Sequence, residues 1–225
     1  MAADLQREKE FAALHSLRFL RDGMTIGLGT GSTASIAISL IAGQGFRHIR
    51  GVPTSEASAA QARSLGIPLV ELNDVASIDV TIDGADEIAP GLALIKGGGG
   101  ALLREKLVAE ASRQMIVISD SSKLVARLGR FPLPVEVIPF NWKHIQAKFQ
   151  ARDLRPVLRL RAGEAFRTDQ GNYILDCHCG DIPNAGWLAR EIKATGGVVD
   201  HGLFLGLATL ALVANADGLV REIHP

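Results

Sequence analysis

The first half of the chain alternates short β-branched runs with helical patterns, and this alternation limits the folds open to it. Strand patterns and helical patterns follow one another from residue 4 to about residue 125. Such alternation predicts βαβ units and a parallel sheet. Helices are expected at residues 4–21, Thr33 to Ala42, Glu56 to Leu65 and Ala101 to Ala111, and strands at Thr25 to Leu28, 47–53, around Leu69, Ile78 to Ile82 and 115–120.

The pattern changes at "FPLPVEVIPF", residues 131–140, where prolines and an alternating strand interrupt the βαβ order. Strands in "PVLRLRA" and "GNYILDCH" and a helix in "NAGWLAREIKATG" follow. The apolar ending "GLFLGLATLALVA" is expected to return to the first domain as a buried element. The predicted fold is therefore α/β. It combines a Rossmann-like parallel-sheet domain, residues 1–130 plus 203–225, with a second, smaller α+β domain at 131–202.

Charge and hydropathy restrict the partners of the protein. Lys plus Arg and Asp plus Glu number 24 each, so no net field draws nucleic acid or an anionic membrane to the surface. The start, "MAADLQREKEFAALHSL", lacks the basic and apolar regions of a signal peptide. No apolar run reaches the roughly 20 residues that span a bilayer. We therefore expect a cytoplasmic protein that binds neither nucleic acid nor membrane.

The only cysteines, Cys177 and Cys179, flank His178 and raise the question of a metal site. Zinc sites use four ligands with recognisable paired spacing, which this stretch lacks. Strand alternation would send both cysteines to one face and His178 to the other. A structural role is favoured for the cysteines, so this stretch predicts no metal site.

A glycine-rich turn, "GLGTGSTA" at residues 27–34, follows a predicted strand and opens a predicted helix. Helix amides with Ser32 and Thr33 can bind an anion there, which predicts a phosphate site. An ordinary turn with a helix cap is the alternative. The spacing fits neither the dinucleotide fingerprint nor the nucleotide P-loop. The similar stretch "VPTSEAS" is weaker and favours a helix cap alone.

An acidic turn follows the next strand, in "IDVTIDGADEI". Gly84 allows a sharp turn, so Asp83 at the strand end and Asp86 can point into the same space. Converging carboxylates could hold hydroxyl groups or a metal. Solvated acids in an Asp-Gly turn are the alternative.

Two lysines also stand near predicted strand ends, where ligands of parallel sheets gather. Lys96 precedes four glycines, Gly97 to Gly100, and Lys123 follows the strand "MIVISD". An ordered glycine costs roughly 0.5–1 kcal/mol relative to alanine, so the run favours a functional loop over a linker. Either lysine could bind phosphate or stabilise an oxyanion, or could be a solvated surface charge.

Glu105 lies in the helix beyond the glycines, on an apolar stripe with Leu102, Val108 and Ala109. A buried carboxylate has a raised pKa or a specific partner, which makes Glu105 a candidate general base. A structural ion pair is the alternative. Leu103 and Leu107 occupy the opposite side, so burial of both sides of the helix is expected.

These stretches, in this order and spacing, resemble type A ribose-5-phosphate isomerase. The resemblance rests on "GLGTGSTA", "VTIDGADEI", "LIKGGGGALLREK", "SDSSKLV" and "LGRFPLPVEVIP", and it covers nearly the whole chain. It implies interconversion of D-ribose 5-phosphate and D-ribulose 5-phosphate in the non-oxidative pentose phosphate pathway, without metal or cofactor. A small-molecule sugar phosphate is the implied partner, and a homodimer or homotetramer the implied assembly.

The resemblance also implies a role for each motif. Glu105 would be the base that moves a proton between carbons 1 and 2 through an enediolate. Asp83 and Asp86 would hold sugar hydroxyls and help to open the ring, and Lys96 would stabilise the oxyanion. The implied substrate-binding residues are Thr30, Gly31, Ser32, Thr33, Lys123 and Lys9 at the phosphate, Gly84 and Ala85 in the acidic turn, and the amides of Gly97, Gly98 and Gly99 at the oxyanion.

A non-catalytic sugar-phosphate sensor on the same fold is the alternative function. Such a protein could keep "GLGTGSTA" but would have no need of Glu105. Conversion of the sugar phosphate would indicate the isomerase, and binding without conversion would indicate the sensor.

Overall fold

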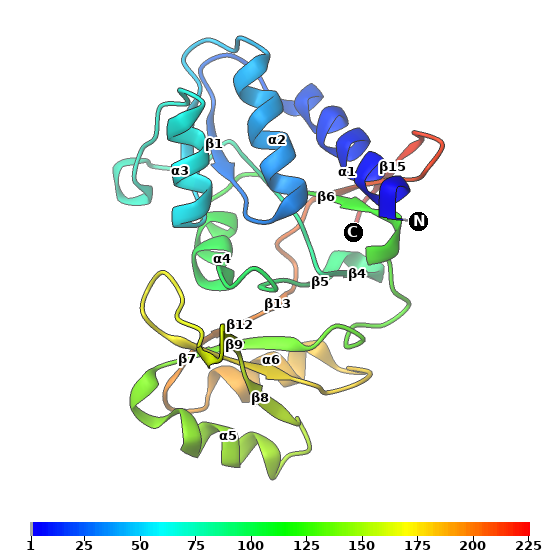
Figure 1. The fold of residues 1–225 in the computed structure, drawn as a ribbon. Coiled ribbons are helices and arrows are strands. Elements are labelled where there is room, and N and C mark those ends of the chain that lie inside the picture. Colours follow the sequence, from blue (N-terminus) through cyan, green and yellow to red (C-terminus); the bar gives the residue numbers. More distant parts are fainter. Residues whose placement is uncertain (1) are drawn as a thin grey trace.

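A six-stranded sheet organises the upper part of the molecule, in the order β15-β14-β6-β3-β1-β2 (Figure 1). The computed structural model describes residues 2–225. Five strands run parallel, and only the edge strand β15 is antiparallel, to β14. The strands are β1 (Thr25–Leu28), β2 (Arg50–Pro53), β3 (Val80–Asp83), β6 (Met115–Asp120), β14 (Leu210–Ala214) and β15 (Val220–Ile223). The predicted α/β fold with a parallel sheet is confirmed.

Helices cover this sheet because its central strands are apolar on both faces, as is usual in parallel sheets. Along β6, Ile116 and Ile118 pack in the core beneath α1 and α2, whereas Met115 and Val117 face the opposite core. The helices are α1 (Ala2–Ser16), α2 (Ser32–Gly43), α3 (Glu56–Ser64) and α4 (Leu102–Glu110). The bounds of each helix lie within two residues of the predicted bounds, with one exception. Helix α1 ends at Ser16, and a 3-10 turn continues from Leu17 to Phe19.

A small antiparallel sheet, in the order β13-β5-β4, lies below the parallel one. It consists of β4 (Glu87–Ala89), β5 (Ala93–Ile95) and β13 (Leu203–Phe204). None of these strands exceeds three residues, so none carries a periodic sequence pattern. The sheet matters because β5 ends directly before Lys96.

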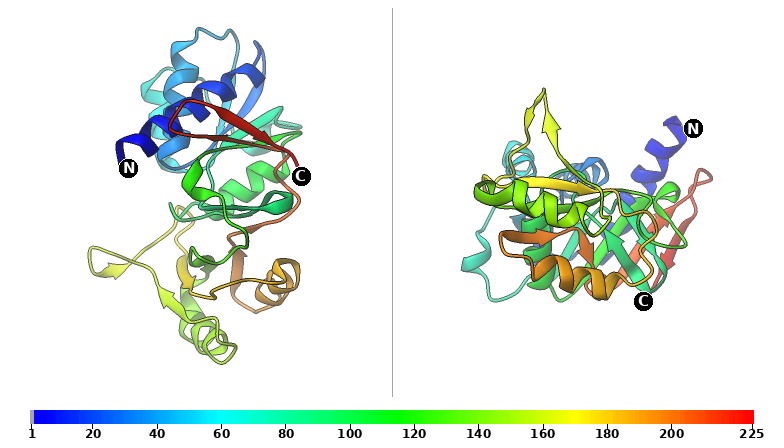
Figure 2. Two further views of the ribbon diagram at one scale, coloured as in Figure 1. Left: turned by 90° about the vertical axis from the view of Figure 1, so that its right-hand side faces the viewer. Right: turned by 90° about the horizontal axis from the view of Figure 1, so that it is seen from below.

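The lower part is a four-stranded antiparallel sheet, in the order β12-β7-β11-β8. Its strands are β7 (Leu133–Val137), β8 (Pro156–Leu158), β11 (Tyr173–Cys177) and β12 (Val198–His201), and its helices are α5 (Trp142–Gln150) and α6 (Ala185–Lys193). A hairpin of β9 (Leu160–Arg161) and β10 (Glu164–Ala165) projects from it (Figure 2). All of these elements fall within residues 131–202, which we keep as a proposed domain.

Several local expectations were wrong. Leu107 is 44% exposed, so α4 is not buried on both sides. Leu69 forms a single bridge to Gly51 in place of a strand, because Pro68 and Gly66 interrupt the backbone there. Helix α5 and strand β15 were not anticipated.

Among the described residues, every helix is too short or too polar to span a bilayer.

Candidate active site

A cavity opens where β1, β3 and β6 of the parallel sheet reach their carboxyl ends, next to the loop that follows β5. Ligands of parallel sheets bind at such edges because the loops after the strands meet there. The cavity is lined by Lys9, Thr30, Gly31, Ser32, Thr33, Gly84, Ala85, Asp86, Lys96, Gly97, Gly98, Gly99, Glu105 and Lys123. The fold therefore brings together every predicted site residue except Asp83, which lies directly beneath.

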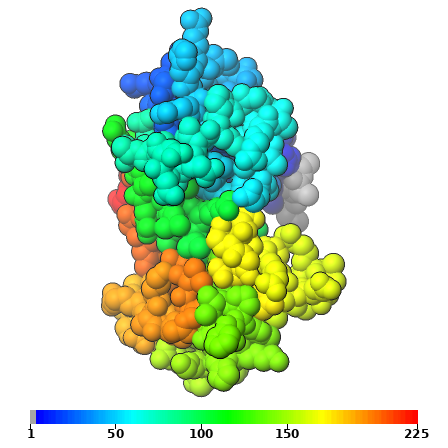
Figure 3. Space-filling view, turned by 90° about the vertical axis from the view of Figure 1, so that its left-hand side faces the viewer, coloured from blue at the N-terminus to red at the C-terminus, as the bar shows by residue number. Residues whose placement is uncertain are grey.

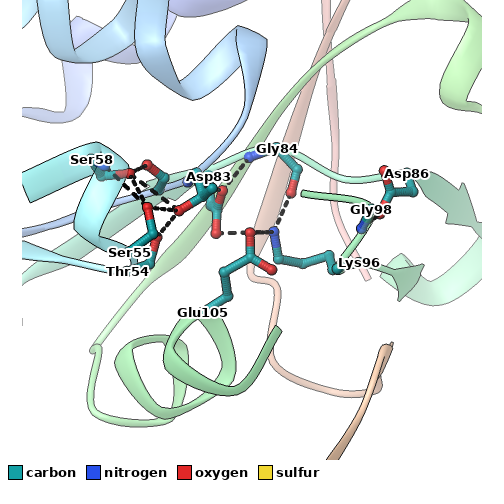
Figure 4. Close-up of polar contacts among 12 residues, drawn as sticks. Thr54, Ser55, Ser58, Asp83, Gly84, Asp86, Lys96, Gly98 and Glu105 are labelled. Atoms are coloured by element: carbon teal, nitrogen blue, oxygen red, sulfur yellow. Dashed lines mark hydrogen bonds and ion pairs between the residues drawn. The ribbon is translucent and has the colours of Figure 1, made fainter. Parts of the chain in front are cut away.

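Three buried charged side chains form the centre of the site (Figure 4). Lys96 Nζ lies 2.9 Å from Asp83 Oδ2 and 3.4 Å from Glu105 Oε1, and it donates a 2.6 Å hydrogen bond to Gly84 O. The ammonium group is thus held between two carboxylates and one carbonyl. Glu105 Oε2 is buried and accepts no hydrogen bond from residues 2–225, so this oxygen can still accept a proton.

Burial and neighbouring charge act in opposite directions on this cluster. Burial raises the pKa of Glu105 to about 8, because the effect of desolvation exceeds the stabilising attraction of Lys96. For Lys96, burial alone would lower the pKa. The negative charges of Asp83 and Glu105 outweigh burial and raise the pKa above its usual value. The site thus holds a fixed cation beside a carboxyl group that can exchange a proton near neutral pH.

Asp83 supports the site from below. Its side chain is fully buried, and Oδ1 accepts hydrogen bonds from the amides of Thr30 at 3.0 Å and Gly84 at 2.8 Å. A Cβ on Gly29 would lie 2.3 Å from Asp83 Oδ1, so only glycine allows the β1 loop to approach this closely. Asp83 was predicted to contact sugar hydroxyls directly. Its position does not favour that contact, because its side chain is not exposed in the cavity.

The glycine loop is fixed by Asp86, which lines the cavity. Asp86 Oδ2 accepts a 2.8 Å hydrogen bond from Gly98 N. Gly97 and Gly100 have positive φ angles of 103° and 87°, which L-residues rarely adopt. Of the three amides predicted to face the oxyanion, the Gly98 amide therefore already donates its hydrogen bond to Asp86. Those of Gly97 and Gly99 have no hydrogen-bond partner in the described part of the chain.

The opposite end of the cavity is rich in hydroxyls, amides and ammonium groups. Helix α2 begins at Ser32, directly after Gly31, whose φ of 105° allows the turn. Lys9 Nζ donates a 3.1 Å hydrogen bond to Ser32 Oγ, so the fold brings α1 to this end. Lys123 lines it from the 3-10 turn after β6. Cations beside a helix N-terminus create a site suited to phosphate.

The "VPTSEAS" stretch contributes more than the predicted helix cap. Ser55 does cap α3, by accepting a 3.0 Å hydrogen bond from Ser58 N. In addition, Thr30 Oγ1 lies 2.7 Å from Thr54 Oγ1 and 2.8 Å from Ser55 Oγ, and Ser58 donates to Gly29 O at 2.6 Å (Figure 4). These hydroxyls hold the loop between β1 and α2 from behind. The repeated Thr and Ser residues were the signal that could have revealed this role.

The cysteines lie far along the chain from this site. Cys177 ends β11 and is buried, whereas Cys179 is partly buried beyond the strand, and both are free thiols. Burial raises the pKa of Cys179 to about 11, which keeps it a thiol near neutral pH. No cluster of three His, Cys, Asp or Glu side chains able to hold a metal occurs within residues 2–225.

An acid–base centre and an anion site that share one cavity at the carboxyl edge of a parallel sheet define an α/β enzyme of sugar-phosphate chemistry. The family model of ribose 5-phosphate isomerase A (phosphoriboisomerase A) matches residues 50–218. The chain belongs to this family.

Relatives matched over nearly their whole length, and solved structures, support the same family assignment. The chain is 50% identical to ribose-5-phosphate isomerase A of Caulobacter vibrioides, over 98% of this chain and 99% of that protein. It is 52% identical to the Chloroflexus aurantiacus protein of the same name, over 95% of this chain and 92% of that protein. The ribose 5-phosphate isomerase of Plasmodium falciparum superposes with a TM-score of 0.93 at 38% identity, over 98% of this chain and 99% of that one. A D-ribose-5-phosphate isomerase in complex with phospho-erythronic acid superposes with a TM-score of 0.95 at 36% sequence identity, over 98% of this chain and 99% of that one.

Proposed function

We propose that the protein interconverts D-ribose 5-phosphate and D-ribulose 5-phosphate through an enediolate. The observation that carries the proposal is the buried Glu105 carboxyl group, with one unpaired oxygen, beside the Lys96 ammonium group in a cavity that also contains an anion site. Aldose–ketose exchange needs a base that reaches two adjacent carbons, a donor for the oxyanion and an anchor for the distant phosphate.

Each step can be assigned to side chains of the cavity. Asp86 holds sugar hydroxyls and assists ring opening, and Glu105 then removes the proton from carbon 2. Negative charge develops on oxygen 1, where the Lys96 ammonium group and free glycine amides stabilise it. A proton passes from oxygen 2 to oxygen 1, and Glu105 returns its proton to carbon 1 to give the ketose.

The remaining residues bind and position. Ser32, Thr33, Lys9 and Lys123, with the amide of Gly31, hold the phosphate, and Thr30 lines this end of the cavity, while Gly84 and Ala85 form the wall beside the sugar. Asp83, buried under the cavity, orients Lys96 and the Thr30 backbone. No step in this sequence needs a metal or a cofactor.

Turnover tests this function directly. Purified protein is mixed with ribose 5-phosphate in D₂O, and the ketose and deuterium at carbon 1 are followed by NMR. We expect ketose formation with solvent deuterium in the product, unchanged by chelator. Ligand binding without conversion would favour the non-catalytic sensor. Loss of turnover on metal removal would contradict the metal-free mechanism.

The pH dependence of kcat/KM should report the raised pKa of Glu105. Only the carboxylate can accept the carbon-2 proton, so kcat/KM should rise tenfold per pH unit below about 8 and level off above it. The measurement is kcat/KM between pH 6 and pH 10 at constant ionic strength. A profile that is flat from pH 7 to pH 9 would show that Glu105 is already ionised in the free enzyme.

Replacement of Lys123 should weaken substrate binding more than it slows the chemistry. In Lys123→Met, loss of one charged contact to the phosphate, about 1.5–3 kcal/mol, should raise KM by roughly 10- to 100-fold. Lys148, exposed on α5, provides the control variant Lys148→Met, which should leave KM unchanged. An equal fall in kcat with unchanged KM would place Lys123 at the reacting carbons.

We further propose that the enzyme acts in the pentose phosphate pathway of the cytoplasm as a homodimer or homotetramer. The proposed small domain exposes large apolar side chains, including Phe140 at 95% and Trp187 at 54%, which suit contact with a second copy. Sedimentation velocity gives the assembly state. A monomer at micromolar concentration would contradict this proposal and leave the chemistry untouched.

A further inference from the structure

An arginine from the lower sheet contacts the glycine loop of the active site. Arg159, between β8 and β9, donates through Nη1 to Gly97 O at 2.9 Å and to Gly98 O at 3.1 Å. Its side chain is only 15% exposed, and it also pairs with Asp176 of β11, through Nε to Oδ2 at 2.8 Å and Nη2 to Oδ1 at 2.5 Å. The guanidinium group therefore has one fixed orientation, with one edge on a carboxylate and the other on the loop.

The segment that follows Arg159 lies against the upper part at two further points (Figure 3). Phe166 is buried against Gly100: a Cβ on that glycine would lie 2.4 Å from Phe166 Cζ. Asp169 Oδ2 accepts a 2.9 Å hydrogen bond from Glu56 N, at the start of α3. The contact between Arg159 and the loop is thus part of a continuous junction.

Peptide geometry determines what Arg159 does to the loop. In a planar trans peptide the C=O and N–H groups point in opposite directions. Because Gly98 O points to Arg159, the amide of Gly99, in the same peptide, points away from Arg159. Gly99 lines the cavity, and its amide has no partner among the described residues. The preceding peptide is held at both edges, since Gly97 O accepts from Arg159 and Gly98 N donates to Asp86.

We propose that Arg159 is a positioning residue that holds the Gly98–Gly99 peptide with the Gly99 amide directed at the developing oxyanion. The inference rests on the proposed function, because the amide matters only if an oxyanion forms. Arg159 does not line the cavity. Its charge is paired with Asp176, so it acts through hydrogen-bond geometry and not through its electric field at the substrate.

The test compares Arg159→Ala with Arg161→Ala. Arg161 is the matched control because its guanidinium lies 4.4 Å from the Phe166 ring, in the same segment, but makes no hydrogen bond to the glycine loop. Misplacement of a catalytic group by about 1 Å can cost roughly 100-fold, so we expect kcat of Arg159→Ala to fall by about 10- to 100-fold. KM should change little, because the phosphate end is intact. Arg161→Ala should retain wild-type kcat and KM.

Chemical rescue separates positioning from stability. Methylguanidinium at millimolar concentration should occupy the space left in Arg159→Ala and restore part of the lost kcat, with no effect on wild type or Arg161→Ala. Wild-type kcat in Arg159→Ala would overturn the proposal. A fall in kcat that tracks a lowered Tm and resists rescue would also overturn it. Absence of turnover in wild type would instead refute the proposed function, so the two failures are distinct.

Discussion

Replacement of Glu105 by glutamine should lower kcat by about 100- to 10,000-fold, the usual range for loss of a general base. The amide keeps the shape of the side chain but cannot accept the carbon-2 proton. Glu105 is 4% exposed and lies 3.4 Å from Lys96 through one oxygen, so no other carboxylate can occupy its position. The measurement is kcat for ribose 5-phosphate together with exchange of the carbon-2 proton into D₂O.

The control is Glu110→Gln, at the exposed end of the same helix, which should retain wild-type kcat. Thermal unfolding of Glu105→Gln should remain cooperative, because Lys96 keeps its contacts with Asp83 and Gly84. If the glutamine variant turned over at a near-normal rate, the base would have to be sought elsewhere, with Asp86 the next carboxylate in the cavity.

Glu105 could be singled out from the sequence because a helix places residues on faces by a fixed period. A carboxylate on an apolar stripe is costly unless it has a function or a partner, and the structure shows it buried beside Lys96. Strand-end positions were equally informative. β1 and β6 were predicted with their observed bounds, and the loops after β1, β3 and β6 meet at one edge of the sheet.

What could not be predicted depends on contacts between distant segments. No local pattern places Lys9 of α1 beside Ser32, 23 residues on, or Arg159 against Gly97, 62 residues back. Burial of a charged side chain can likewise depend on a partner far along the chain. On α4, Lys106 is buried because Asp200 and the carbonyl of His201 receive its ammonium group.

Helix α5 shows the same limit at the level of secondary structure. Its core-facing residues Trp142, Ile145 and Phe149 follow a helical spacing, but the segment has only nine residues, so the pattern is a weak signal of a helix. The packing of these residues against the lower sheet, and not local propensity, stabilises the helix.

Replacement of Lys96 by methionine should have effects on both catalysis and stability. Loss of the donor to the oxyanion should reduce kcat by about 100- to 1,000-fold. Asp83 would then be left buried without a cation, whereas Glu105, with its raised pKa, can take up a proton; breaking such a buried pair typically costs about 3–5 kcal/mol. The free energy of unfolding, measured by urea denaturation near neutral pH, should fall accordingly. A variant with wild-type kcat would exclude Lys96 from the chemistry.

The double variant Lys96→Met/Asp83→Asn separates the two roles. Asn removes the negative charge that Lys96→Met leaves unpaired, and its oxygen can still accept the amide hydrogen bonds that Thr30 and Gly84 donate to Asp83 Oδ1. Part of the lost stability should therefore return. The kcat should stay low, because no ammonium group faces the oxyanion. If activity recovered together with stability, Lys96 would serve only to neutralise Asp83, and the glycine amides would have to stabilise the enediolate without it.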